Sequence, residues 1–162
     1  MPPQPTSPLE EGLTMAKQIV SSHAVARPLG PYSLAVRSGN FVFVSGTVGW
    51  KPDGSTSPDI RAQCRQMYEN VREVLKAAGA SFDDLVSTTT YLVNASDYPA
   101  LNEVRREYFQ KDPPASAVVV VKELVRPDLL VEVEAVAELR TKAAGGRSVR
   151  RPARKARKAR RR

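Results

Sequence analysis

Two glutamates, one histidine and one cysteine are the side chains of this sequence that first suggest chemistry. Glu132 and Glu134 alternate with Val131, Val133 and Ala135 near the C-terminal end of the chain. Because successive side chains of a strand point to opposite faces, this segment has an apolar face and an acidic face. Such a strand either borders water or lines a cleft, and the pattern alone leaves both interpretations open.

The single histidine and the single cysteine have simpler interpretations. An imidazole has an ordinary pKa near 6.5, so His23 could act as an acid or a base, but nothing in the sequence supplies a partner for it. Its loop position favours a surface residue. Cys64 falls on the apolar stripe of a predicted helix, which favours a core residue over a reactive thiol. One cysteine and one histidine also exclude an internal disulfide and metal sites built from several of either residue.

The charge of the chain is concentrated at its C-terminus. Ten lysines and arginines and no acidic residue occur in residues 147–162, whereas the formal net charge of the whole chain is +8. Subtracting these ten charges leaves −2 for residues 1–146. We therefore predict a mildly acidic domain in residues 15–140 and a disordered basic tail in residues 141–162.

The N-terminal segment and the hydropathy of the chain complete the domain prediction. Residues 1–14 contain four prolines and little that could pack, so we expect a disordered extension. No apolar run approaches the roughly 20 residues that span a bilayer, and the N-terminus lacks the features of a signal peptide. The expected location is cytoplasmic, with no membrane partner.

The sequence between residues 15 and 140 predicts six strands and two helices. Turn residues and hydrophobic periodicity predict strands at 17–21, 32–37 and 41–45, a helix from Asp59 to Gly79, a strand at 85–93, a helix at 97–110, and two strands within 113–137. Two helices can cover only one face of such a sheet. The predicted fold is therefore α+β, a two-layer sandwich of a mostly antiparallel sheet with two helices on one face. The other face is solvated or buried by other subunits, and its valines and alanines favour burial against symmetric copies.

Several segments of the chain resemble the reactive intermediate deaminase family, also described as Rid, YjgF-like or endoribonuclease L-PSP-like. The resemblance covers about residues 17–139. The matching segments are Gly30-Pro31-Tyr32-Ser33, Phe43-Val44-Ser45-Gly46, Leu75-Lys76-Ala77-Ala78-Gly79, residues 98–109 with Asn102, and Val131-Glu132-Val133-Glu134-Ala135-Val136-Ala137.

The resemblance implies a chorismate-mutase-like fold that forms homotrimers, with a cleft between neighbouring subunits. It also implies hydrolysis of reactive 2-imino acids to 2-keto acids and ammonia, which needs no metal and no organic cofactor. Matched residue by residue, the glutamate that positions water corresponds to Glu132, the cleft tyrosine to Tyr32, and a further family position to Asn102. A glutamate can orient or deprotonate water, and an arginine can bind the substrate carboxylate at two points.

The chain departs from the family at that arginine. The family's deaminases carry it in a P-x-R-like stretch that enters the penultimate strand, and here the stretch Pro114-Ala115-Ser116 places Ser116 at the arginine position. A serine can hydrogen-bond a carboxylate but supplies no charge. The connection to the last strand is one residue longer than usual and contains Arg126, which either substitutes for the missing arginine or is a solvated loop residue.

These observations lead to one main expectation and one alternative. The main expectation is deaminase-type hydrolysis of small imines or enamines, weakened by the missing arginine, with Glu132 as the catalytic residue and Tyr32, Ser116, Asn102 and Arg126 as substrate-binding residues. The alternative is a noncatalytic trimer that binds a small molecule. In that case the basic tail would associate with nucleic acid without sequence preference.

Overall fold

The computed structural model describes residues 16–140. The predicted N-terminal extension and the predicted basic tail lie outside the described residues, so the domain boundaries stay predictions. Within the described part, no helix is both long enough and apolar enough to cross a membrane.

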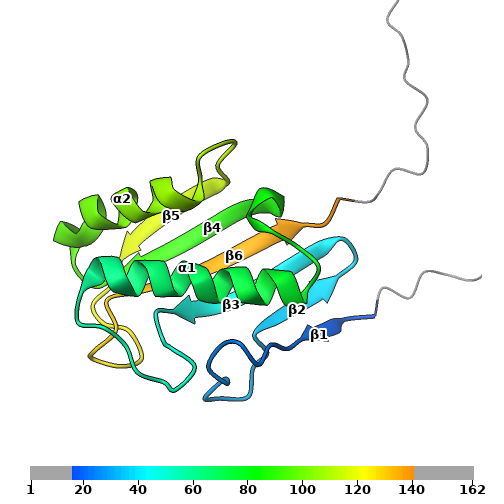
Figure 1. The fold of residues 1–162 in the computed structure, drawn as a ribbon, viewed down its shortest axis with the longest axis horizontal. Coiled ribbons are helices and arrows are strands. Elements are labelled where there is room, and N and C mark those ends of the chain that lie inside the picture. The colour runs from blue at the N-terminus through cyan, green and yellow to red at the C-terminus, as the bar shows by residue number, and fades with distance from the viewer. Residues whose placement is uncertain (1–15, 141–162) are drawn as a thin grey trace, which may run out of the picture.

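The described chain forms one mixed sheet with two α-helices on one face (Figure 1). The strand order across the sheet is β1-β2-β3-β6-β4-β5, and only the β4–β5 pair is parallel. The predicted α+β sandwich is therefore confirmed. The elements are β1 (Gln18–Val20), β2 (Ala35–Ser38), β3 (Phe41–Val48), α1 (Ile60–Ala77), β4 (Leu85–Leu92), α2 (Tyr98–Tyr108), β5 (Ala115–Val120) and β6 (Val131–Glu138), with short 3₁₀ helices η1 (Phe82–Asp84) and η2 (Ala95–Asp97).

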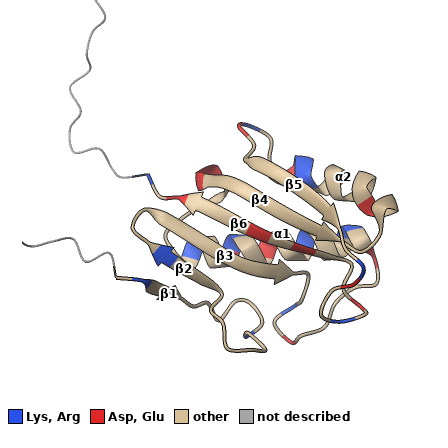
Figure 2. Ribbon diagram, turned by 180° about the vertical axis from the view of Figure 1, so that it is seen from behind, with Lys and Arg blue, Asp and Glu red and all other residues tan. Residues whose placement is uncertain are grey.

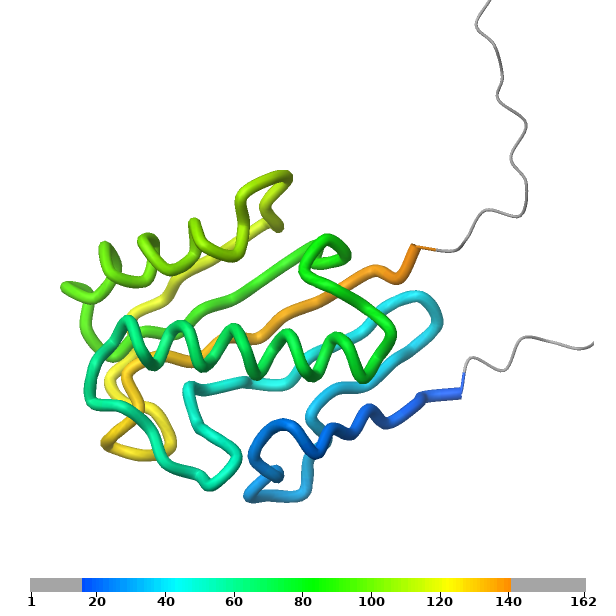
Figure 3. The backbone as a smooth tube through the Cα atoms, viewed as in Figure 1, coloured from blue at the N-terminus to red at the C-terminus, as the bar shows by residue number. Residues whose placement is uncertain are grey.

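The last strand lies in the middle of the sheet. β6 pairs with both β3 and β4, while β5 pairs with β4 on the far edge (Figure 3). The two strands predicted within residues 113–137 are consequently not neighbours, because β4 lies between them. This central position buries Val131, Val133, Ala135 and Ala137 against the helices and leaves the glutamates of β6 on the opposite face.

Helix α1 begins and ends where its sequence predicts. The Asp59 carboxylate accepts a hydrogen bond from the backbone N–H of Ala62 at 2.8 Å, which caps the N-terminus. Gly79 follows the C-terminus with φ +77°, a conformation that favours glycine. Between these ends, Cys64 is fully buried in the core and burial raises the pKa of its thiol to about 12, which agrees with a core residue.

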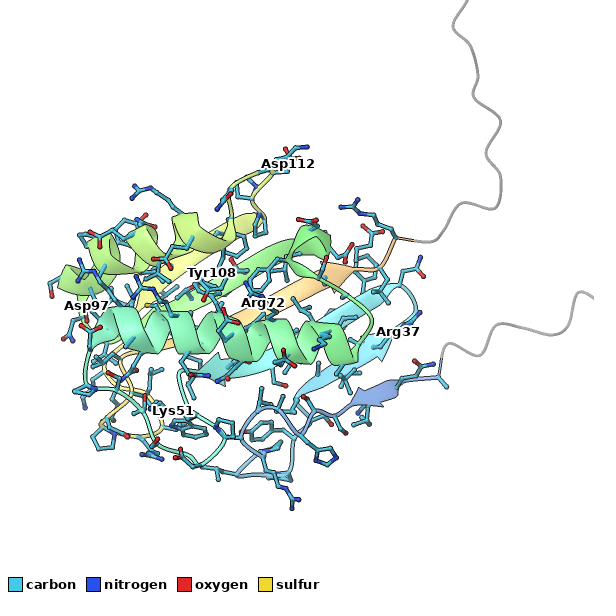
Figure 4. The ribbon with its side chains drawn as sticks, in the orientation of Figure 1. Arg37, Lys51, Arg72, Asp97, Tyr108 and Asp112 are labelled. Atoms are coloured by element: carbon cyan, nitrogen blue, oxygen red, sulfur yellow. The ribbon has the colours of Figure 1, made fainter. Side chains whose placement is uncertain are left out.

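Helix α2 lies beside α1 and is attached to it by charge pairs and an aromatic cluster. Arg61 and Arg65 of α1 bind Glu103 and Glu107 of α2, each at 2.7 Å. The guanidinium of Arg72 lies 5.2 Å from the ring centroid of Tyr108, between the two helices (Figure 4). These contacts fix α2 over the β4–β5 side of the sheet.

The sheet face opposite the helices is largely uncharged apart from the acidic residues of β6 (Figure 2), and it mixes hydrophobic side chains with Ser87 and Thr89 of β4. Figure 2 shows this face with a short red segment on β6 among mostly uncharged strands. Large hydrophobic side chains are exposed here, and Phe43 is 49% accessible. Exposed hydrophobic side chains of this kind suit burial against other copies of the chain, which stays a prediction of the sequence.

Candidate functional site

Glu132 lies in β6 between Val48 of β3 and Tyr91 of β4. Its carboxylate occupies the space that a side chain at position 46 would need. A Cβ atom built on Gly46 would lie only 1.9 Å from Glu132 Oε1. Gly46 belongs to an irregularity of β3, where the register with β6 shifts between Val44 and Thr47. The bulge and the glycine together leave room for the carboxylate against the backbone of β3.

The two carboxylates of β6 have different surroundings. Glu132 has no hydrogen-bond partner among residues 16–140, and burial raises the pKa of its carboxyl above the usual value, with a smaller contribution from nearby Glu134. Glu134 instead accepts a hydrogen bond from the Tyr91 hydroxyl at 3.0 Å, which raises the pKa of that phenol. Glu132 is therefore the carboxylate that is free to bind a water molecule and to take a proton from it.

Tyr32 is positioned near Gly46 by the loop that precedes β2. The Ser45 hydroxyl donates to the backbone carbonyl of Ser33 at 2.6 Å, and the Ser45 N–H donates to the carbonyl of Leu34 at 3.0 Å. Tyr32 and Gly46 consequently line the same small cavity of about 40 Å³, which is large enough for one or two waters. The expected strand at 32–37 begins only at Ala35, because Tyr32 lies in the irregular segment that follows the bend at Gly30 and Pro31.

Two of the predicted binding residues lie on a helix and in a loop. Asn102 is half-buried on α2, in the helical layer, whereas Glu132 is on the opposite face of the sheet. Arg126 lies in the β5–β6 connection, where Asp128 binds its guanidinium and the ring of Trp50 lies 5.3 Å away. This local pairing corresponds to the solvated-loop interpretation of Arg126, and a substrate-binding role for either residue stays a prediction.

Ser116 lies on the helix side of β5. It pairs in register with Thr88, whose side chain is buried toward the helices, and its hydroxyl oxygen accepts hydrogen bonds from Arg105 Nη2 at 2.6 Å and Thr88 Oγ1 at 3.2 Å. The structure therefore does not bring Ser116 together with Glu132 within one subunit.

The position that the family arginine would occupy in this chain can be compared with the direction in which each β5 side chain points. Pro113 and Pro114 are consecutive, so the P-x-R-like stretch can be matched to end at either Ala115 or Ser116. Ala115 points to the same face as Glu132, because it alternates with Ser116 along the strand. Ser116 points to the helix side, whereas the other residues of β5 on the Ala115 face are Ala117 and Val119. β5 thus supplies no cation there.

Several residues that build this site were not identified as such from the sequence. Gly46 was recognised only as part of a motif and a loop, yet a glycine within a strand is a signal for a bulge or a close approach. Asn70 donates to the carbonyls of Val48 and Trp50 at 2.9 and 2.7 Å and so fixes the end of β3. Tyr91 orders Glu134, and no periodicity in the sequence marks it.

The described residues contain no group of three or more His, Cys, Asp or Glu side chains that could hold a metal ion. His23 is exposed, as expected for a surface residue.

Comparison with known proteins identifies the family. The family model described as Endoribonuclease L-PSP matches residues 22–139. A RutC family protein of Pyrococcus abyssi is 39% identical over 125 residues, covering 76% of this chain and 98% of its own. A protein of Dermatophagoides farinae named 2-iminobutanoate/2-iminopropanoate deaminase is 36% identical over 122 residues, covering 74% of this chain and 94% of its own.

The solved structures agree with the sequence comparison. The crystal structure of Escherichia coli TdcF with bound serine superimposes with a TM-score of 0.72 at 31% identity, covering 75% of this chain and 98% of that chain. The family-model match, residues 22–139, includes both β6 and the loop of Tyr32. The chain therefore belongs to the Rid family, which is also described as YjgF-like or endoribonuclease L-PSP.

Proposed function

We propose that this protein hydrolyses small 2-imino acids or their enamine tautomers to 2-keto acids and ammonia, with Glu132 as the general base. The observation that carries the proposal is the half-buried Glu132 carboxylate, which has no hydrogen-bond partner in residues 16–140 and a raised pKa. Deaminase names among the relatives support the same class of reaction.

The reaction needs few groups from the protein. Water bound by Glu132 adds through its oxygen to the iminium carbon of the substrate, and Glu132 takes the released proton. The resulting carbinolamine then loses its amino group as ammonia when the C–N bond breaks. The proton held by Glu132 is returned to the departing nitrogen. The freed Glu132 carboxylate then takes the hydroxyl proton of the carbinolamine, whose oxygen becomes the carbonyl oxygen of the product.

The proposed site is completed by a second copy of the chain. The exposed apolar face around Phe43 fits a homotrimer in which neighbouring sheet faces enclose Glu132 and Tyr32. Within such a cleft the face of β5 that carries Ala115 offers no cation for the substrate carboxylate. We therefore expect slow turnover, because a charge-assisted bidentate contact contributes more than a neutral hydrogen bond.

The proposal is tested with freshly generated 2-iminobutanoate and two glutamate variants. Glu138 is the matched control, because it is an exposed glutamate on the same face of β6. Glu132→Gln should lower kcat by about 10²- to 10⁴-fold, the usual contribution of a general base, while Glu138→Gln should retain wild-type kcat. Equal turnover of the wild type and Glu132→Gln would contradict the role of Glu132 as the base.

A second pair of variants tests the missing arginine. Ala115→Arg places a guanidinium on the Glu132 face of β5 and should increase kcat/KM by about tenfold or more, as expected for one charge-assisted contact. Ser116→Arg places it on the helix side, where it displaces the Arg105 contact, and should not increase kcat/KM. An increase for Ser116→Arg alone would show that the match ending at Ser116 is the relevant one.

A further inference from the structure

We infer that the basic segment of residues 147–162 binds the phosphate backbone of double-stranded nucleic acid and so attaches the folded domain to it. The segment lies outside the described residues. Its sixteen residues include ten lysines and arginines and no aspartate or glutamate. This density of positive charge suits a partner with closely spaced negative charges, and a DNA duplex carries one charge per about 1.7 Å of its axis.

The folded domain cannot neutralise the charge of this segment. Residues 16–140 contain 14 lysines and arginines and 15 aspartates and glutamates, so the net charge of the domain is −1. Arginines of α1 already bind Glu103 and Glu107 of α2, and Arg140 lies 3.4 Å from a carboxylate oxygen of Asp84. Binding of the segment to its own domain would leave most of its ten charges without a counter-charge, so an external polyanion is the better partner.

The cations of the domain itself are poorly arranged for a nucleic acid. Figure 2 shows the lysines and arginines of the described residues dispersed over several elements and interleaved with acidic residues. Arg61, Arg65 and Arg72 each lie 2.7 Å from a glutamate oxygen. Cations that are dispersed and paired in this way bind a phosphate backbone less well than ten cations in one short segment without acidic residues.

The composition of the segment selects the class of polyanion. Eight of its ten cations are arginines, whose planar guanidinium binds a phosphate group at two points. Residues 141–162 contain no aromatic side chain, although aromatic stacking is the usual means of holding single strands. They also contain no Leu, Ile, Phe or Trp to insert into a lipid surface, and no Asn or Gln to bind an adenine edge. A duplex backbone, bound without base preference, therefore fits best.

The segment follows the end of β6 that is remote from the candidate catalytic residue. Glu132 lies near the start of β6 and Glu138 at its end, a separation of about 20 Å along the strand. Arg140 is held at this far end, where its guanidinium donates to the backbone carbonyl of Asp83 at 3.0 Å. A duplex bound by residues beyond Arg140 need not cover Glu132, so we expect binding and turnover to be independent.

The probe is a fluorescently labelled DNA duplex of about 20 base pairs, titrated with the full-length protein while its anisotropy is followed. If six to ten phosphates are neutralised, the affinity should fall by about 10³- to 10⁵-fold between 50 and 200 mM KCl. A shortened chain that ends at Ala144 should show no saturable binding at either salt concentration. Its midpoint of urea unfolding should equal that of the full-length protein, because the described domain is intact.

Two triple variants of the full-length protein localise the binding further. Glutamine in place of the three arginines of residues 160–162 should make the slope of log affinity against log salt shallower by about 2.7, which is 0.9 for each lost phosphate contact. The matched control replaces Lys17, Lys51 and Lys122 of the domain by glutamine, which removes the same charge. It should change the slope by less than about 0.5.

Other outcomes would overturn the inference. Equal affinities of the full-length and shortened chains would place the binding on the folded domain. Tighter binding of the full-length protein to phosphatidylglycerol vesicles than to the duplex, at equal phosphate concentration, would replace nucleic acid by a lipid surface. The Glu132→Gln variant should bind the duplex as the wild type does, and the shortened chain should retain the kcat of the wild type. This inference and the proposed function can therefore fail separately.

Discussion

Replacing Gly46 by alanine should damage catalysis while leaving the fold nearly intact. A Cβ at this position would lie 1.9 Å from Glu132 Oε1 and 3.0 Å from its Cδ, and ordinary contact begins near 3.4 Å. The carboxylate must therefore move by about 1.5 Å. Because the obstacle is the end of a flexible side chain and Gly46 does not have a positive φ, the backbone has no reason to shift.

The expected magnitude follows from the precision that catalysis requires. A misplacement of about 1 Å can lower a rate by about 10²-fold, so Gly46→Ala should lower kcat/KM by roughly that factor. Its free energy of unfolding should change by less than about 1 kcal/mol, since only the end of the flexible Glu132 side chain has to move. The assays are initial rates on 2-iminobutanoate and urea unfolding of the same preparations.

Two other glycines provide matched controls for this variant. Gly30→Ala should affect neither quantity, because its Cβ would make only an ordinary contact of 3.4 Å with the Tyr32 ring. Gly49→Ala should lower the free energy of unfolding, which Gly46→Ala should leave nearly unchanged. Its Cβ would lie 2.5 Å from the backbone oxygen of Gln63, and overpacking of this kind costs about 1–3 kcal/mol. Wild-type activity in Gly46→Ala would refute the placement of Glu132 over this glycine as a requirement for function.

Two further predictions concern stability. Gln63→Ala should lower the free energy of unfolding by about 2–4 kcal/mol in urea melts, because this fully buried side chain donates to the carbonyls of Ser57 and Asp128 and accepts from the N–H of Leu130, and the unpaired groups would stay buried; a loss below 1 kcal/mol would show that water replaces these contacts. Glu132→Gln should make the protein more stable than the wild type at pH 7 but not at pH 4. The folded-state pKa of Glu132 is raised above its unfolded value, so the stability of the wild type is greatest below that unfolded value and falls as the pH rises through the folded pKa. A stability difference that does not depend on pH would contradict the direction of this shift.

The sequence predicts the layers of this fold because its periodicities are strong. The alternation of Val131, Glu132, Val133 and Glu134 assigns the two faces of β6 correctly, and the capping residue Asp59 marks the start of α1 to within one residue. What the pattern does not contain is the order of strands across the sheet. β6 enters between β3 and β4 through pairings made far along the chain, and only the folded backbone reveals them.

The candidate site is predicted less completely, since its geometry depends on contacts between distant segments. Glu132 and Tyr32 could be named from the resemblance, but the contact of Glu132 with Gly46 joins residues 86 positions apart and leaves no local signal. The same is true of Asn70, whose helical position says nothing about the carbonyls of β3 that it binds. Local propensity identifies elements, whereas these hydrogen bonds are properties of their packing.

The missing arginine illustrates how a one-residue shift changes a functional inference. Along a strand, a shift by one residue moves a side chain to the other face of the sheet, so the two prolines before β5 make the sequence match ambiguous. If the match ends at Ser116, the missing arginine would have pointed toward α2. If it ends at Ala115, the missing arginine would have lain on the same face as Glu132. The absence of a cation on that face of β5 holds for either match, because Ala115, Ala117 and Val119 are the residues that point there. The choice between the two matches decides whether an arginine at position 115 or at position 116 could restore the contact with the substrate carboxylate. In the present structure Ser116 accepts a hydrogen bond from Arg105.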